Sequence, residues 1–206
     1  MKPIAFGVTL GFALLGCVSP LLATPITYSE IVTATGSLGA SAFTNALVTI
    51  TLTGDTANVA GVGTLLNPGV ATVAVPGLGT ATFTDADLRA VDNQALARAG
   101  ISDFTLGRAI LFTDNLVFAT YDLKGPIGPI FGPPAFNPNF GFPTTLGNLS
   151  LASISGNSSF TATTVTTVPE PTSLLLLGTG FVGVVARCFR QKRANSPRDD
   201  FPPRCP

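Results

Sequence analysis

Histidine is absent from all 206 residues, which removes the usual general base, the Ser-His-Asp relay and the commonest metal ligand. Carboxylates are the chemically active side chains that remain. A glycosidase would need two of them on facing strands, and Asp85 and Asp114 are a pair that could meet. Eight acidic residues are scattered between residues 24 and 168, and among that many a candidate pair is easily found by chance. We therefore predict a protein that is not an enzyme and has no catalytic residue.

Calcium is the one plausible ion, because Asp85, Asp87 and Asp92 cluster and Ca²⁺ prefers oxygen ligands. The segment lacks the glycine at the sixth position and the closing glutamate of an EF-hand loop. The acidic start of a solvated helix explains the same three residues. We favour that interpretation and predict neither a metal nor a cofactor.

A segment rich in Pro, Gly and Phe occupies residues 125–143 and contains six prolines in 19 positions. Proline cannot donate to a strand ladder, so we predict an ordered surface loop that is held to the fold by Phe131, Phe136, Phe140 and Phe142. The alternative is an aromatic platform on which sugars stack. That alternative would make the protein a carbohydrate-binding module at the cell surface, with polysaccharide as its partner.

The elements that must position these residues are mostly strands. Thr- and Val-rich runs with near alternation predict strands at 26–35, 46–53, 69–75, 79–84, 110–112, 116–121, 149–154 and 159–167. Turn residues punctuate them at 54–55, 67–69, 76–77 and 156–157. The pattern indicates an all-β domain, an antiparallel β-sandwich or a jelly roll.

One segment of this domain favours a helix. Residues 85–99 begin with acidic residues, continue with Ala and Arg, and end before Gly100. Leu88, Val91, Ala95 and Leu96 would share one face. We predict one short helix here, with a strand followed by a loop as the alternative.

The N-terminus has the pattern of a secretory signal peptide over residues 1–23. Lys2 precedes the apolar run 4–15, and cleavage is expected after Ala23. Lipidation at Cys17 is the alternative, because residues 14–17 resemble a bacterial lipobox. The chain has only two other cysteines, Cys188 and Cys205, so none lies between residues 24 and 167 and that domain has neither a disulfide nor a cysteine-based zinc site.

The predicted exported domain, residues 24–167, is mildly acidic. It contains eight acidic and four basic residues, a net charge of −4, although the whole chain is neutral. A lysine-poor acidic surface argues against nucleic-acid binding, which depends on neutralising phosphates.

The C-terminal region contains three elements of a membrane signal, one after the other along the sequence. Pro169, Glu170 and Pro171 form a stiff break, and 13 uncharged residues follow at 174–186. A helix over 172–189 would be about 27 Å long, just enough to span a bilayer. The basic cluster after it is a topological stop on the cytoplasmic side, and it consists of Arg187, Arg190, Lys192 and Arg193. Residues 194–206 are then a cytoplasmic extension.

This tail, residues 168–193, resembles the PEP-CTERM sorting tail of exported bacterial proteins. The resemblance rests on Pro169, Glu170 and Pro171, on the apolar helix and on its basic stop. It implies processing by a membrane-embedded exosortase in a Gram-negative-type bacterium that makes exopolysaccharide and biofilm. The resemblance also implies that the protein is exported, passes through an inner-membrane intermediate, and is finally located at the cell surface or outside the cell. The continuation through residues 195–206 departs from such tails, which usually stop soon after the basic cluster.

Overall fold

The computed structural model describes residues 24–164, and within this part the chain forms twelve strands, two 3₁₀ turns and no α-helix. The predicted all-β fold is therefore confirmed. The strands are β1 (Pro25–Leu38), β2 (Ser41–Asp55), β3 (Ala60–Val62), β4 (Thr64–Val75), β5 (Gly79–Thr82), β6 (Leu88–Asn93), β7 (Arg98–Asp103), β8 (Arg108–Asp114), β9 (Ile127–Gly132), β10 (Pro134–Phe136), β11 (Gly141–Phe142) and β12 (Leu149–Thr164). The 3₁₀ turns are η1 (Thr56–Asn58) and η2 (Leu116–Ala119).

All pairings between these strands are antiparallel, and they join into one sheet in the order β10-β8-β7-β6-β4-β2-β1-β12-β11. The sheet is nearly closed because the chain passes from one of its edges to the other. β9 pairs with β12, and the chain then continues into β10, which pairs with β8. The N–H of Asp114 in β8 donates to the carbonyl of Pro133 over 2.9 Å at the crossing point.

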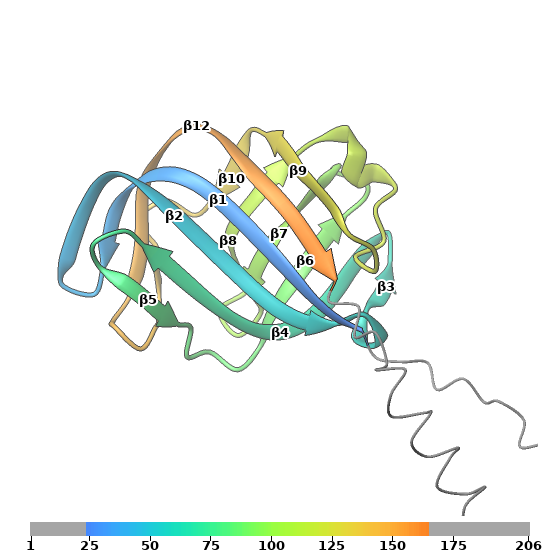
Figure 1. The fold of residues 1–206 in the computed structure, drawn as a ribbon, viewed down its shortest axis with the longest axis horizontal. Coiled ribbons are helices and arrows are strands. Elements are labelled where there is room, and N and C mark those ends of the chain that lie inside the picture. Colours follow the sequence, from blue (N-terminus) through green and yellow to red (C-terminus); the bar gives the residue numbers. More distant parts are fainter. Residues whose placement is uncertain (1–23, 165–206) are drawn as a thin grey trace, which may run out of the picture. The chain divides into compact units, whose positions relative to one another are not determined.

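The sheet folds over on itself into two layers. In Figure 1, β1, β2, β4 and β12 cross in front of β6, β7 and β8. β4 belongs to both layers, because residues 64–69 pair with β6 and residues 69–74 pair with β2. Gly69 lies at this corner, where a Cβ atom would be 2.3 Å from the carbonyl oxygen of Thr53. The predicted turn at 67–69 is therefore wrong, and its glycine instead allows a close backbone approach inside a strand.

The predicted turn at 156–157 is also wrong. Residues 149–164 form one continuous strand, and the register against β1 slips between the pairs Ile31–Ser159 and Thr33–Ser155. Gly156, with φ of 77°, lies in this bulge. The local turn chemistry is thus used to bend a long strand rather than to end it.

The predicted short helix at 85–99 is wrong as well. Its sequence forms β6, a turn and β7, and the turn is held by Asn93, whose side chain accepts from the N–H of Leu96 over 3.1 Å. β6 pairs with β4, and β7 pairs with β8, so both strands are central in the sheet. Long-range pairing with β4 and β8 outweighs a local helical preference of roughly a few tenths of a kcal/mol per residue.

Two further local expectations differ from the structure. Residues 116–119 form the 3₁₀ turn η2 instead of a strand, capped by Asn115, whose Oδ1 accepts from the N–H of Val117. The segment 125–143 contains the short strands β9, β10 and β11 instead of forming a loop throughout. Its prolines are accommodated because each strand is short and lies near the edge where the sheet closes.

The interior contains an aromatic cluster beneath η2. Phe160 of β12 packs edge-on against Phe118 at 5.4 Å between ring centroids and contacts Tyr121 and Tyr28 at 6.1 Å each. Tyr28 Oη donates to the carbonyl of Leu123 over 2.6 Å. These contacts pin the segment 116–123 over one end of the sheet.

Candidate functional site

The predicted sorting residues lie outside the residues that the structure describes. This holds for Pro169, Glu170 and Pro171, for the helix at 172–189, and for the basic stop of Arg187, Arg190, Lys192 and Arg193. The signal peptide at 1–23 lies outside as well. Within residues 24–164, none of the helical segments has the length and hydropathy that crossing a membrane requires.

Inside the described domain, a hollow of about 200 Å³ opens beside the turn between β7 and β8. The lining residues are Ser102, Asp103, Phe104, Gly107, Arg108 and Ala109. The turn begins where the Oδ1 atom of Asp103 accepts from the N–H of Leu106 over 3.0 Å. It ends at Gly107, whose φ of 63° is readily adopted only by glycine. The hollow is thus a product of hairpin geometry.

A carboxyl pair lies at the base of this hollow. Asp103 is fully buried, and burial together with a hydrogen bond to the Asp85 carboxyl raises its pKa to about 6. The Oδ2 atoms of Asp85 and Asp103 are buried, and neither has a hydrogen-bond partner of normal geometry among the described residues. Because two carboxylates in contact repel each other, the charge of Asp85 adds to the effect of burial on the pKa of Asp103.

Two guanidinium groups stack on phenylalanine rings at the same end. Arg89 lies over Phe104 at 4.6 Å from the ring centroid and forms a two-bond ion pair with Asp87, at 2.6 and 2.8 Å. This ion pair lowers the pKa of Asp87. Arg108 lies over the ring of Phe140 at 5.7 Å, and no carboxylate of the described part is within ion-pair distance of it. The mouth of the hollow therefore combines aromatic faces with one unpaired cation.

The structure separates the three carboxylates that suggested calcium. Asp92 is buried on the inner face of β6, with its pKa raised to about 7 by burial and secondarily by the charge of Asp122. Asp85 contacts Asp103, and Asp87 binds Arg89. Among residues 24–164, acidic side chains do not gather into a group that could hold a metal ion.

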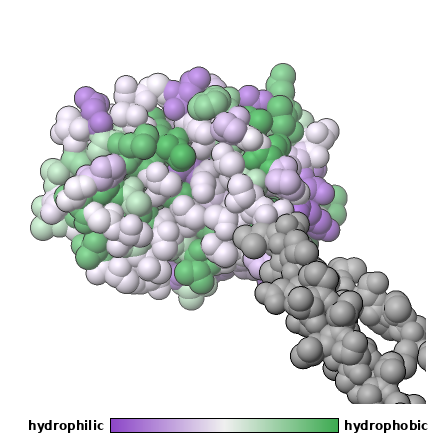
Figure 2. All heavy atoms as spheres, viewed as in Figure 1, coloured by the Kyte–Doolittle hydropathy of each residue, from purple (hydrophilic) through white to green (hydrophobic). Residues whose placement is uncertain are grey.

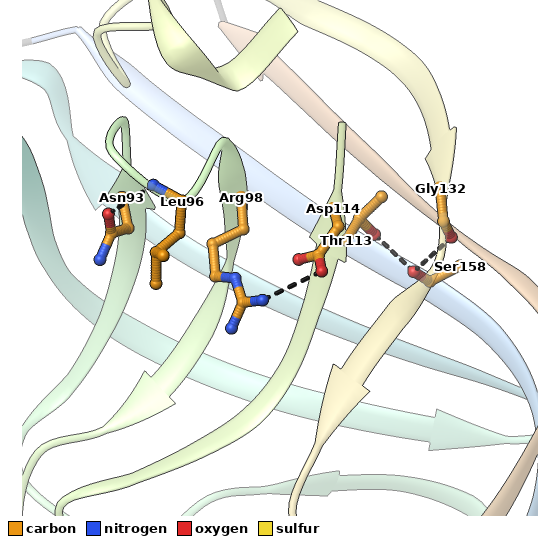
Figure 3. Close-up of polar contacts among 7 residues, drawn as sticks. All are labelled: Asn93, Leu96, Arg98, Thr113, Asp114, Gly132 and Ser158. Carbon is orange, nitrogen blue, oxygen red and sulfur yellow. Dashed lines mark hydrogen bonds and ion pairs between the residues drawn. The ribbon is translucent and has the colours of Figure 1, made fainter. Parts of the chain in front are cut away.

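The suggested pairing of Asp85 with Asp114 is wrong. Asp85 contacts Asp103, which is the register partner of Arg108 at the start of β8. Asp114 ends the same strand, about 20 Å farther along. There it binds Arg98 over 3.0 Å on the outer side of the hairpin, as Figure 3 shows.

The phenylalanines of 125–143 do not act as one group. Phe142 is buried and Phe140 packs against it at 5.1 Å, while Phe136 is half-buried. Phe131 is 60% exposed on β9. The prediction that all four rings hold the segment to the fold is therefore wrong for Phe131, and Phe140 contacts Arg108, which lines the hollow.

A series of buried polar side chains, which the sequence did not predict, links β1, β8, β12 and β9 where the sheet closes. Thr113 Oγ1 lies 2.8 Å from Glu30 Oε2 and 2.7 Å from Ser158 Oγ, which in turn donates to the carbonyl of Gly132 over 3.3 Å. Part of this series is drawn in Figure 3. Its one detectable signal is Glu30 itself, a carboxylate at an inward position of an alternating strand.

The hydrogens of this series can be counted. Three oxygen–oxygen contacts in series need three protons, and the two hydroxyls supply two. Burial raises the pKa of Glu30 well above 4.5, against the opposing hydrogen bond from Thr113. The neutral acid is then the favoured form, and its proton completes the series from Glu30 through Thr113 and Ser158 to Gly132. An ionised carboxylate would instead accept from Thr113 and leave one contact without a proton.

Comparison with known proteins gives one match. Residues 167–191 match the model of the PEP-CTERM protein-sorting motif. Neither the curated proteins nor the solved structures contain a significant match to this chain. The resemblance read from the tail is confirmed, and it covers only a small part of the chain.

Proposed function

From the premise that this chain is a bacterial exosortase substrate, exported through membrane-associated sorting, we propose that its β domain is a non-enzymatic component of the cell surface or extracellular matrix. The processed protein is displayed at the surface of a Gram-negative-type bacterium or released from it, in association with exopolysaccharide and biofilm. The observation that carries the proposal is the sorting motif at 167–191.

Two features of the β domain support a role without catalysis. The sequence has no histidine, the side chain that most often serves as a general base. The carboxyls with raised pKa, Glu30, Asp92 and Asp103, are all fully buried, and Asp103 borders the hollow beside the β7–β8 turn. Glu30 and Asp92 have no exposed surface that a substrate could reach, which favours a role in packing over proton transfer.

Mass spectrometry of the surface-exposed form tests the sorting part of the proposal. We expect a mature C-terminus near the Pro-Glu-Pro sequence, without the apolar segment. Replacing Pro169, Glu170 and Pro171 by alanine should leave the unprocessed chain in the inner membrane. A matched control replaces Pro202 and Pro203, which lie beyond the motif. A surface form that still contains Phe189 would contradict processing at this place.

A second candidate function, carbohydrate binding, is favoured by the hollow beside the β7–β8 turn. Phe104 is 40% exposed there, and Arg108 is exposed beside Phe140. Aromatic faces next to hydrogen-bonding groups suit the apolar face and the hydroxyls of a sugar ring. The hollow of about 200 Å³ is smaller than a typical drug-sized pocket, which limits it to one or two sugar residues.

Binding of the full chain to a polysaccharide array tests this candidate. Phe104→Ala and Arg108→Ala should each abolish the signal. Phe131→Ala is the matched control, because that ring is at least as exposed but lies on β9, away from the hollow. Binding that survives both changes, or that is lost equally in the control, excludes the hollow as the sugar site.

A further inference from the structure

Four large apolar side chains stand exposed on loops at one end of the sheet. Val62 is 99% exposed, Leu116 is 85%, Leu96 is 58% and Val117 is 45%. We call these four residues the apolar rim. Three of them exceed the exposed large hydrophobic residues on the turns at the opposite end, where the highest value is 49%, at Leu146. The other highly exposed ones lie within strands, and they are Val70 (66%), Phe131 (60%) and Leu47 (51%). Such a concentration of apolar side chains marks an interaction surface more often than chance exposure.

Backbone hydrogen bonds join the loops that carry the rim. The N–H of Gln94 in the β6–β7 turn donates to Gly63 in the β3–β4 turn over 2.9 Å. The N–H of Asn115, which precedes η2, donates to Ala97 of the β6–β7 turn, also over 2.9 Å. The buried Phe118 anchors η2 from below. The rim is therefore one supported ridge instead of four independent loop tips.

The rim lies at the end of the sheet where the chain leaves the domain. Because every neighbouring pair is antiparallel, β12, β2, β6 and β8 all run in the same direction, and their last residues point to one end. These last residues are Thr164, Asp55, Asn93 and Asp114, and the last three lead into the loops of the rim. Figure 1 shows β3, η2 and the end of β12 at this end. Figure 2 shows hydrophobic side chains exposed there, over the region of η2 and β9.

We propose that the apolar rim docks on the lipid surface that holds the sorting motif. This inference rests on the membrane-associated sorting of the proposed function. The predicted membrane helix begins at residue 172, and eight residues extend no farther than about 29 Å from Thr164. A bilayer that retains the motif is therefore kept within reach of the end that carries the rim.

Charge selects the kind of lipid. The domain has a net charge of −4, so an anionic headgroup layer would repel it. Four apolar side chains inserted at the headgroup level instead gain free energy from burial, which does not depend on headgroup charge. The partner is accordingly a zwitterionic lipid surface. This orientation leaves the hollow at the β7–β8 turn on the side away from the lipid, open to a soluble glycan.

The test uses the full chain in phosphatidylcholine vesicles that contain a lipid-borne quencher. Cys17, Cys188 and Cys205 are replaced by serine, and a fluorophore is placed at Leu116→Cys. The matched control carries the fluorophore at Leu146→Cys, which is 49% exposed just before β12 begins, at the opposite end. Lipid should quench the label at position 116 at least about twofold more than the label at position 146.

A second pair of variants tests the contribution of the ridge. With the fluorophore at Val62→Cys, the change Leu116→Asp should lower quenching at least about twofold, because a charge at the ridge resists insertion. Leu146→Asp should leave it unchanged. Both changes are at exposed positions, so the fold should tolerate them.

Each alternative outcome contradicts the proposal in a recognisable way. A chain that floats with the vesicles but shows equal quenching at positions 116 and 146 excludes rim docking, while membrane retention of the motif stands. A label at 116 that is shielded without lipid quenching, in a dimer detected by light scattering, assigns the rim to a second copy and overturns the lipid assignment. A chain that does not float contradicts both the rim proposal and the membrane-associated sorting on which it rests.

Discussion

The two ends of this sheet have opposite properties, although the same strands run between them. At the rim end, η2 is pinned by Phe118 and Tyr121 against Phe160, and the apolar side chains above it point outward. At the hollow end, the β7–β8 turn stays open above the Asp85–Asp103 pair. The difference arises from the connections between strands, because a plug of aromatic residues covers one end and a short turn leaves the other uncovered. A raised pKa by itself does not distinguish the ends, because Asp92 and Asp103 both have one.

The largest expected effect on stability comes from removing the ring of Phe118 from the aromatic cluster beneath η2. Phe118→Ala deletes a fully buried ring that contacts Phe160 at 5.4 Å, so the free energy of unfolding should fall by about 3–5 kcal/mol. Urea denaturation followed by circular dichroism measures it. Leu116→Ala is the matched control on the same turn and should change stability by under about 0.5 kcal/mol. Equal losses in the two variants would mean that η2 is not anchored by its buried ring.

The two buried carboxyls at opposite ends should make the domain less stable as the pH rises. Asp92 and Asp103 have folded pKa values of about 7 and about 6, above the ordinary value of 3.8. The folded state therefore holds protons that the unfolded state has released, and the free energy of unfolding falls by about 1.4 kcal/mol per pH unit for each group between its two pKa values.

The variants Asp92→Asn and Asp103→Asn separate the two contributions. At pH 8 the first should be more stable than the natural protein by about 2–4 kcal/mol and the second by somewhat less, while at pH 3 both gains should vanish. Thermal unfolding across this pH range measures the slopes. A slope that is unchanged in both variants would assign the pH dependence to other groups, with Glu30 as the next to test.

A smaller effect is expected at the buried hydrogen bonds of Glu30, Thr113 and Ser158, where the sheet closes. Thr113→Val removes the hydroxyl between Glu30 and Ser158 and leaves buried polar atoms unpaired, which should cost about 1–3 kcal/mol. Thr84→Val is the control, since Thr84 is exposed. Glu30→Gln should preserve the contact, because an amide N–H can donate to Thr113 as the neutral acid does. If Glu30→Gln were as destabilising as Thr113→Val, the description of Glu30 as a neutral acid that donates to Thr113 would be wrong.

The smallest effect on stability should come from the open end. Phe104→Ala removes a ring that is 40% exposed and a cation–π contact with Arg89, so the expected loss is under about 1 kcal/mol. Chemical denaturation of the full chain measures it alongside the array experiment. A loss as large as that of Phe118→Ala would show that the hollow end is packed as tightly as the plugged end, and the contrast between them would fail.

Sequence reasoning was most successful where a signal is local. The alternation of residues 46–53 predicts a half-buried strand, and Val48, Ile50 and Leu52 are indeed fully buried in β2. The ordered Pro-Glu-Pro, apolar and basic elements of the tail are likewise read from adjacent residues, and the match over 167–191 confirms their identity. Local patterns were therefore enough for the fold class and the sorting motif, because period-two alternation and a contiguous motif need no distant partner.

The features that could not be predicted from the sequence depend on pairing between strands that lie far apart along the chain. Residues 85–99 are strands because β4 and β8 offer pairing, and residues 67–69 form a corner because β4 changes its neighbour there. The proximity of Asp85 to Asp103, and the separation of both from Asp114, result from hairpin register. The identity of these three residues as aspartates does not indicate which residues face them across the sheet. Strand pairing and the connections between strands, which only the tertiary structure shows, placed the buried acids, the hollow at one end and the apolar rim at the other.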